Sequence, residues 1–330
     1  MNWHRQILVA GLVAVLASPA LAATLEVRIA KQPGLGYLPL MVMRHDQLLE
    51  KHAKTLGLDV KSEWLTFTGG AAMNEALISG NLDIATGGIP PLLTIWSRTK
   101  NNLKIKGIAA LSSQPQLLLT TNPNVKKLAD FSSVDKIALP AVKVSNQAVM
   151  IQMAAIKQMG EDKVFSVDPY TVSMGHVDAM AALLGGSITA HFGQSPYQEL
   201  EMKDPKVHAV LNSYDIVGAP YPIAVGYATD RFVKENPKVL EAFVAALKEA
   251  QQKIQTDPDF AAKVWIEMDV KKFSMDEAKS ILSKSKMTWD AAPHGTITFL
   301  KHMNKVGLIK ADADDWKDIY FAPIHDLHGS

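Results

Sequence analysis

The sequence predicts an α/β protein of two similar lobes, with mostly parallel sheets flanked by helices and a ligand cleft between the lobes. Segments that alternate like strands are repeatedly followed by segments with helical periodicity, which is typical of βαβ units. The second half of the chain repeats the glycine and proline positions of part of the first half at a fixed offset. The 330 residues, 48% of them hydrophobic, suit two domains with sizeable cores.

The first 22 residues have the layout of a secretory signal peptide. Arg5 supplies a positive start, residues 7–17 form an apolar run, Pro19 breaks it, and Ala20-Leu21-Ala22 offers a cleavage site. The alternative is a membrane anchor, but this apolar run is too short to span a bilayer of about 30 Å as a helix. Because the chain has no cysteine, it offers no thiol for lipidation. We therefore expect a periplasmic protein, cleaved near Ala22, that is not a lipoprotein.

The first half of the mature chain alternates strands and helices. Gly57 ends the first predicted helix, Thr68-Gly69-Gly70 opens the second with Thr68 as its N-cap, and Gly80 closes it. The predicted elements are strands at 25–30, 60–67 and 82–86, helices at 40–56 and from 68–70 through 79, and a loop at 32–39.

The second half repeats this alternation and then becomes helical. Ser145 opens one helix and Gly160 ends it. The predicted elements are strands at 136–139, 165–172 and 188–192, and helices at 145–159, 175–184, 237–255, 258–267, 274–285 and 293–306.

An offset of 106 residues aligns the two halves. Both then read as a helix with Ala-Leu, a glycine, a short strand and Gly-x-x-Pro. The identities are Gly69 with Gly175, Ala76 with Ala182, Leu77 with Leu183, Gly80 with Gly186, Gly87 with Gly193, and Pro90 with Pro196. The alternative is that two unrelated βαβ units share these glycine positions by chance, but related lobes explain the matches better. The pattern occurs only twice, which argues against a solenoid.

The candidate site lies in the loops after the strands, where α/β proteins bind ligands against helix N-termini. Thr68-Gly69-Gly70 and Ser145-Asn146 each open a helix, Lys143 adds a charge, and Tyr37 can stack on a ligand. His191 belongs to the site only if it faces the cleft; otherwise it is a core residue. The predicted ligand-binding residues are Gln32, Gly36, Tyr37, Thr68, Gly69, Gly70, Gly88, Lys143, Ser145, Asn146, His191 and Gln194.

The composition and motifs argue against several functions. Without cysteine there is no disulfide, thiolate metal site or thiol nucleophile, and the formal charge of +1 gives no field to attract nucleic acid. Removal of Arg5 makes the mature chain formally neutral. No HExxH, GxSxG, P-loop or GxGxxG motif is present, and the histidines have no metal-ligand spacing. We expect no catalytic residues, no bound metal and no cofactor.

Three stretches resemble the substrate-binding proteins of nitrate/sulfonate/taurine-type ABC importers: Gly36-Tyr37-Leu38-Pro39, residues 76–84 and residues 232–237. The resemblance covers nearly all of the mature chain and implies a type II periplasmic-binding-protein fold. It places lobe 1 at 23–112 and 226–330, lobe 2 at 113–225, and hinge crossovers near 111–118 and 221–227. The family's ligand-contacting loops match residues 32–37, 68–70, 87–90, 142–147, 174–176 and 192–195.

The resemblance implies a monomeric receptor that closes around one small molecule and docks on a membrane permease driven by an ATPase. Two departures concern the second lobe: Thr189 stands where the family often has Asp, and Val144-Ser145-Asn146 where it often has Gly-Ser. The helix N-termini and the scarcity of acidic residues in the loops favour an organic anion, a sulfonate or carboxylate.

Two other functions stay open on this evidence. One is an enzyme on the same fold that makes a pyrimidine or menaquinone precursor, although the pyrimidine synthases use a cysteine-rich motif that this chain lacks. The other is the ligand-sensing module of a signalling system, working through a separate partner.

Overall fold

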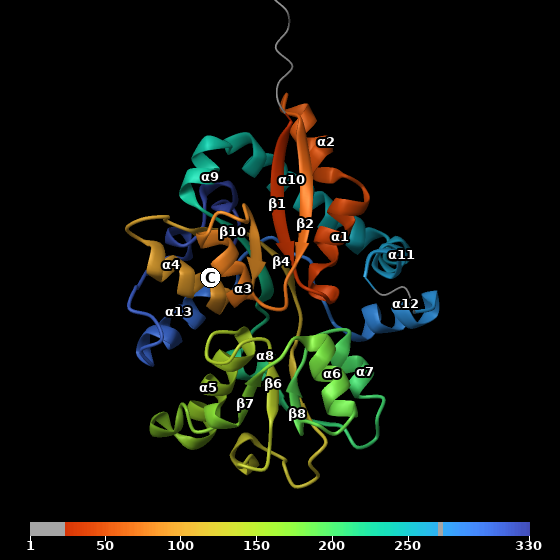
Figure 1. Cartoon of the computed structure of the whole chain (residues 1–330), viewed down its shortest axis with the longest axis vertical. Helices are drawn as coiled ribbons and strands as arrows, with labels where there is room; N and C mark the ends of the chain where they lie inside the picture. Colours follow the sequence, from red (N-terminus) through yellow and green to blue (C-terminus); the bar gives the residue numbers. More distant parts are fainter. Residues whose placement is uncertain (1–23, 270–272) are drawn as a thin grey trace, which may run out of the picture.

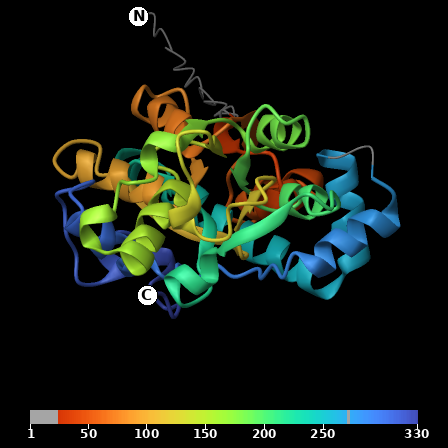
Figure 2. The ribbon, with the colours of Figure 1, turned by 90° about the horizontal axis from the view of Figure 1, so that it is seen from below.

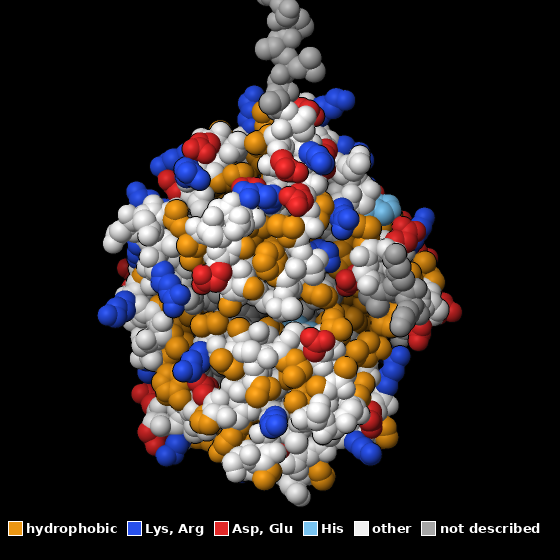
Figure 3. All heavy atoms as spheres, viewed as in Figure 1, with side chains coloured by type: hydrophobic (Ala, Val, Ile, Leu, Met, Phe, Trp, Pro, Cys, Tyr) orange, Lys and Arg blue, Asp and Glu red, His pale blue; other side chains and the backbone are white. Residues whose placement is uncertain are grey.

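The computed structural model describes residues 24–269 and 273–330. The predicted signal peptide lies outside the described residues. Within these two ranges no helix has both the length and the apolar character needed to cross a membrane. On the face shown in Figure 3, Lys and Arg side chains are interspersed with Asp and Glu side chains, as the balanced composition leads one to expect.

In the described part of the chain the strands form three sheets. Strands β1 (Leu25–Lys31) and β2 (Val60–Thr66) pair in parallel. Strand β10 (Pro222–Ala228) runs antiparallel between β3 (Ala85–Gly87) and β4 (Lys106–Ser113), and all of its residues are buried. These two sheets lie in the upper half of Figure 1.

The largest sheet has the order β7-β6-β8-β5-β9 and lies in the lower half of Figure 1. Strand β6 is parallel to β7 and β8, whereas β5 is antiparallel to β8 and β9. The bounds are β5 Leu117–Thr120, β6 Ile137–Leu139, β7 Thr171–Ser173, β8 Ala190–Phe192 and β9 His208–Asn212. The α/β class is therefore confirmed. The sheets are less parallel than predicted: β1–β2 is parallel, β3–β10–β4 is antiparallel, and the largest sheet is mixed because β5 and β9 run antiparallel to their neighbours.

Helices cover the sheets of both halves. Helices α5 to α8 belong to the lower half, while α10 packs on α1, α2 and β4 in the upper half. The helices are α1 Leu38–His45, α2 Leu48–Thr55, α3 Gly70–Ile78, α4 Ile89–Thr99, α5 Asn146–Met159, α6 His176–Leu184, α7 Tyr197–Glu201, α8 Ser213–Val217, α9 Asp230–Glu235, α10 Pro237–Thr256, α11 Pro258–Met268, α12 Met275–Lys284 and α13 Thr296–Lys305. Figure 2 shows α11 and α12 on one side of the molecule and the C-terminal segment on the other.

Two neighbouring segments carry the chain between the halves. One joins β4 to β5 and contains Gln116; the other leads from α8 to β10 and contains Tyr221. The Tyr221 hydroxyl donates a 2.9 Å hydrogen bond to Gln116 Oε1, and both side chains are buried. The two crossings are therefore tied to each other at the boundary between the halves.

The local correspondence between the two halves is confirmed. Helix α6 (His176–Leu184) repeats α3 (Gly70–Ile78) at the predicted offset, with Gly175 and Gly69 as the respective N-caps. The glycines that follow the helices, Gly80 and Gly186, have φ angles of 74° and 75°. Both positions use the left-handed backbone region that glycine occupies without steric cost.

Several predicted boundaries were wrong for local reasons. The helix predicted at 40–56 is two helices, separated where Gln47 has a φ of 53°. The loop predicted at 32–39 already contains the first turn of α1, because Pro39 fits a first helical turn. Thr68 is not the N-cap of α3; Gly69 is, with no side-chain cap.

The strand predicted at 165–172 was also largely wrong. Only β7 (Thr171–Ser173) is extended there, preceded by a 3₁₀ turn over Asp168–Tyr170. Pro169 lacks the backbone N–H that a strand needs for its ladder, so it favours the turn. The strand predicted at 82–86 lies slightly later, as β3 (Ala85–Gly87).

Candidate functional site

The N-termini of α3, α4, α5 and α6 meet between the two halves of the molecule. Gly69, Gly88, Ser145 and Gly175 are their N-caps, and each helix directly follows a strand: β2, β3, β6 and β7 respectively. Ser145 caps α5 with its side chain, which accepts a 3.3 Å hydrogen bond from the Ala148 amide. The unpaired backbone N–H groups at such ends carry roughly half a positive charge per helix. Their convergence therefore makes a positive potential without a formal charge.

These helix ends surround a small cavity of about 30 Å³. That space exceeds the roughly 10–15 Å³ needed to hold one water molecule. The lining residues are Gln32, Tyr37, Gly70, Gly88, Pro91, Gln116, Pro140, Ser145, Asn146, Gln147, His176, Gln194 and Ile223. They come from both halves of the molecule, so a ligand in this cavity would touch both.

The halves are in close contact around the cavity. Gly88 of the upper half lies so near Asn146 of the lower half that a Cβ on Gly88 would stand 2.0 Å from Asn146 Oδ1. Asn146 Nδ2 donates to the Ile223 carbonyl at 3.1 Å, and the Leu35 amide donates to the Ser195 carbonyl at 3.1 Å. The structure is thus a closed form, and a larger ligand requires the halves to separate before it enters.

The cavity lining is polar but carries no Lys, Arg, Asp or Glu among the described residues. Its functional groups are the amides of Gln32, Gln116, Asn146, Gln147 and Gln194, two hydroxyls and one imidazole. Asn146 Oδ1 is buried without a hydrogen-bond partner in the described chain. A buried polar atom left unpaired costs free energy. A ligand or water that donates to Asn146 Oδ1 would recover it.

The Tyr37 hydroxyl is held in place in this lining. It accepts a 2.5 Å hydrogen bond from Gln32 Nε2 and donates a 3.4 Å hydrogen bond to the Thr86 carbonyl. Burial raises the pKa of the Tyr37 phenol far above its ordinary value, so the hydroxyl keeps its proton.

Behind the cavity, three buried titratable side chains form a continuous hydrogen-bonded chain. His176 Nδ1 lies 2.8 Å from His191 Nε2, and His191 Nδ1 lies 2.5 Å from Glu201 Oε1. Burial raises the pKa of Glu201 to about 8 and lowers the pKa of His191, because both charged forms lose their hydration. Burial and the neighbouring His191 lower the pKa of His176 as well. The chain is therefore neutral at physiological pH, with the proton on the carboxyl group.

Seven of the twelve predicted site residues line the cavity: Gln32, Tyr37, Gly70, Gly88, Ser145, Asn146 and Gln194. Gly36 lies behind it, against the Ile223 side chain. Thr68 and Gly69 lie on the loop that enters α3, where they face Gly175 and Pro140 across the boundary. Lys143 is exposed and does not line the cavity, and His191 is fully buried behind His176.

The lining also contains six residues outside the twelve predicted site residues: Pro91, Gln116, Pro140, Gln147, His176 and Ile223. Gln147 and His176 lie in two of the predicted ligand-contacting loops, 142–147 and 174–176. The sequence also marked both residues by their positions at predicted helix starts. His176 is the first residue of α6, and Gln147 follows the correctly placed Ser145-Asn146. Gln116 lies on a crossing segment with no helical or strand periodicity around it, which left no local pattern to identify it.

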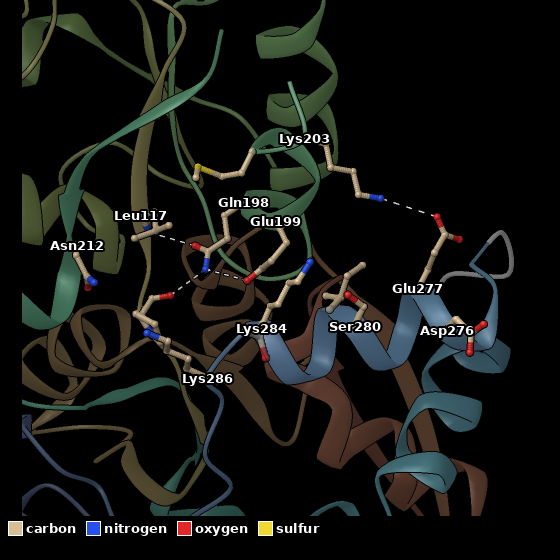
Figure 4. Close-up of a pocket in the computed structure, with 14 residues that line it drawn as sticks. Leu117, Gln198, Glu199, Lys203, Asn212, Asp276, Glu277, Ser280, Lys284 and Lys286 are labelled. Carbon is tan, nitrogen blue, oxygen red and sulfur yellow. Dashed lines mark hydrogen bonds and ion pairs between the residues drawn. The ribbon is translucent and has the colours of Figure 1, made fainter. Parts of the chain in front are cut away.

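A larger groove of about 610 Å³ lies between α7 and α12 (Figure 4). Lys203 spans its edge to Glu277 with a 3.8 Å ion pair. Inside it, Gln198 accepts from the Leu117 amide at 3.1 Å and donates to Glu199 at 3.2 Å. Among the described residues the helix N-termini converge on the smaller cavity and not on this groove. The smaller cavity is therefore the candidate ligand site.

Among the described residues, no group of His, Asp and Glu side chains is arranged to hold a metal ion. In the His176–His191–Glu201 chain, three of the four ring nitrogens form hydrogen bonds between its own members, and His176 Nε2 lies 3.4 Å from Gln147 Nε2.

Replacing Glu201 with Gln is expected to raise the free energy of unfolding relative to the native chain at alkaline pH. The pKa of Glu201 is raised from its ordinary 4.5 to about 8 in the folded chain. A group whose pKa is higher in the folded than in the unfolded chain contributes stability in full below the pKa of the unfolded chain. This contribution is lost as the pH rises to the pKa of the folded chain. The advantage of Glu201→Gln should therefore grow from about pH 4.5 to about pH 8, reaching on the order of a few kcal/mol.

Urea unfolding of both proteins across this pH range measures the difference. Glu241→Gln, at an exposed position on α10, is the matched control and should show no such growth. A difference between Glu201→Gln and the native chain that stays constant with pH would contradict the burial argument.

The fold and the site between its halves define a class. The architecture is the periplasmic-binding-protein fold, shared with the alkanesulfonate-binding protein SsuA from Xanthomonas axonopodis pv. citri bound to MOPS (TM-score 0.67, 16% identity, covering 87% of this chain and 93% of that one). The periplasmic aliphatic sulphonate binding protein SsuA from Escherichia coli matches with a TM-score of 0.65 and 18% identity, covering 91% of this chain and 100% of that one.

The periplasmic nitrate-binding protein NrtA from Synechocystis PCC 6803 also matches, with a TM-score of 0.65 and 15% identity over 88% of this chain and 84% of that one. At these identities the likeness establishes the fold. The chain belongs to the NMT1-like family, whose model matches residues 22–267. No curated protein sequence matches it significantly.

Proposed function

We propose that this chain is the solute-binding receptor of an ABC importer that captures a small organic anion, a sulfonate or a carboxylate. The observation that carries the proposal is the convergence of four helix N-termini on one cavity that both halves line. Each helix end stabilises an anion by roughly 0.3–1 kcal/mol, and somewhat more where it is partly buried. The solved proteins of the same fold include sulfonate-binding and nitrate-binding proteins, which supports this class of ligand.

The neutral lining bears on how such an anion would be held. Without an Arg or Lys in the described lining, selectivity rests on backbone N–H groups and on the amide, hydroxyl and imidazole donors. Gln147 and His176 offer such donors beside the helix ends. A site of this kind favours a compact acceptor group with several oxygens.

The proposed mechanism is hinge closure. The proposed lobes are residues 23–112 with 226–330 and residues 113–225, and the crossovers near 111–118 and 221–227 are the proposed hinges, so that Ile223 at the start of β10 belongs to the second hinge. The Tyr221–Gln116 hydrogen bond ties the two crossovers. A ligand that touches both lobes stabilises the closed state over the open one, since it makes its full set of contacts only there.

The proposed setting follows from the signal sequence and the fold. Removal of the signal peptide near Ala22 gives a periplasmic monomer without a lipid anchor, which delivers its ligand to a membrane permease and the attached ATPase. In this role the chain catalyses no reaction.

A ligand screen tests the proposal. Thermal unfolding with sulfonates, carboxylates and pyrimidines, followed by calorimetry, should identify an anion that stabilises the protein. At a hundredfold excess over its dissociation constant the ligand should add about 2.7 kcal/mol to the free energy of unfolding. Absence of binding across the panel, or tight binding of a cation, would overturn the proposal.

A further inference from the structure

The buried chain of His176, His191 and Glu201 has two hydrogen-bonding states that differ by one proton. When Glu201 is a carboxylate, it accepts from His191 Nδ1–H, and His191 Nε2 accepts from His176 Nδ1–H. His176 Nε2 is then a bare acceptor on the cavity side. These assignments follow from the two contacts of 2.8 Å and 2.5 Å and from the one proton that a neutral imidazole carries.

Adding one proton reverses every bond in the chain. The proton arrives at His176 Nε2, the Nδ1 proton of His176 passes to His191 Nε2, and the Nδ1 proton of His191 passes to Glu201. Glu201 then donates to His191, His191 donates to His176, and His176 Nε2–H becomes a donor toward the cavity. One proton is taken up, none is lost, and all three side chains end uncharged.

The surroundings accommodate both states. Gln147 Nε2 lies 3.4 Å from His176 Nε2, and its amide can donate to the bare nitrogen or, turned over, accept from the protonated one. Gly193 lies beside Glu201 Oε2: a Cβ added to Gly193 would stand 3.6 Å from that oxygen. Glu201 Oε2 is buried and has no partner among the described residues.

Two titratable groups beside the chain, Tyr197 and Glu199, lie on α7, and Asp269 at the end of α11 is a third. Tyr197 stacks on His176 with ring centroids 5.8 Å apart, and burial and the nearby Asp269 raise its pKa, so it stays neutral. Burial also raises the pKa of Glu199, with the charge of Glu201 as a smaller cause. No described Lys or Arg forms an ion pair with Glu201, so burial alone favours its protonated form.

We propose that His176, His191 and Glu201 hold a single exchangeable proton as one unit, which makes His176 Nε2–H the donor that selects an acceptor oxygen of the ligand. This inference rests on the proposed receptor function and assigns one of its specificity-determining groups. It couples ligand capture to protonation of Glu201, a residue that itself does not touch the ligand. His176 contacts the ligand, and His191 and Glu201 position its proton.

Nuclear magnetic resonance of the protein with ¹⁵N-labelled histidine tests the unit without any ligand. The nitrogen shifts report which ring nitrogen carries the proton, and His176→Asn and His191→Asn assign the signals. Both rings should be protonated at Nε2 below the pKa of Glu201, near 8, and should switch together to Nδ1 above it. In Glu201→Gln the switch should disappear. His208, whose Nε2 lies 2.8 Å from the Val125 carbonyl, is an internal reference for a ring that carries a proton on Nε2.

Methanesulfonate then serves as the ligand that tests how the proton unit affects binding. Its affinity should be constant below the midpoint of the switch and fall about tenfold per pH unit above it, because binding then takes up one proton. Glu201→Gln should remove this pH dependence.

The outcomes separate the two proposals. Independent titration of the two rings, or a His176 tautomer that stays fixed in the native chain through the pKa of Glu201, would overturn the proton unit, whether or not methanesulfonate binds. A concerted switch without binding of any sulfonate or carboxylate would uphold the unit and overturn the anion receptor.

Discussion

Gly88→Ala is expected to weaken ligand binding about tenfold to hundredfold by preventing closure of the two halves. Gly88 has a φ of −70°, which alanine adopts freely, so the effect is purely steric. The new Cβ would lie 2.0 Å from Asn146 Oδ1 and 2.5 Å from Asn146 Cγ. The Asn146 side chain cannot swing away without losing its hydrogen bond to Ile223. Overpacking of this kind costs about 1–3 kcal/mol, which reduces the closed population and the apparent affinity in proportion.

Calorimetry with a ligand of the native chain and small-angle X-ray scattering measure this effect together. Ligand should shrink the native protein but not Gly88→Ala. Gly69→Ala is the matched control, because it also stands before a helix at the boundary and its Cβ would meet nothing closer than 3.4 Å. Adding Asn146→Ala to Gly88→Ala removes the clashing side chain and should restore closure. Unchanged affinity in Gly88→Ala would show that these halves do not meet this closely in the bound state.

Local patterns in the sequence were enough to predict three of the four helix starts that build the site, those of α3, α5 and α6. Ser145 before an amphipathic run marked the cap of α5, and the matched glycines at 69 and 175 placed α3 and α6 correctly relative to each other. These features act within one turn of chain, so the residues themselves reveal them.

The parts of the site that the sequence did not reveal depend on contacts between distant segments. Helix α4 was missed because Gly88-Ile89-Pro90-Pro91 has the composition of a turn, although proline is tolerated in a first helical turn. His176 and His191 are fifteen residues apart, and only the packing of α6 beside β8 places them 2.8 Å from each other. Glu201 joins them from α7, so no spacing rule on one helix or strand could have identified the three as a unit.

Gly107→Ala is expected to lower the free energy of unfolding by about 1–3 kcal/mol, because it displaces the C-terminal segment from the sheet of the upper half. Gly107 lies on β4, and its Cβ would stand 2.3 Å from two ring carbons of Tyr320, which is fully buried. The ring cannot retreat easily. The Gly107 amide donates to the Ile319 carbonyl at 2.9 Å, and the Phe321 amide donates to the Gly107 carbonyl at 2.8 Å, so backbone bonds fix Tyr320 on both sides.

Gly226→Ala is the matched control for Gly107→Ala. Gly226 lies on the adjacent strand β10, and its Cβ would meet no atom closer than 3.6 Å. There the loss of backbone freedom in the unfolded chain should make alanine neutral or slightly stabilising, by about 0.4–1 kcal/mol. Urea unfolding of both variants isolates the contact with Tyr320 from the general effect of replacing a strand glycine. Equal stability of the two would mean that the C-terminal segment adds little to the fold. A loss confined to Gly107→Ala would make residues 316–321 a structural part of the lobe that carries α3 and α4, and hence of half the ligand site.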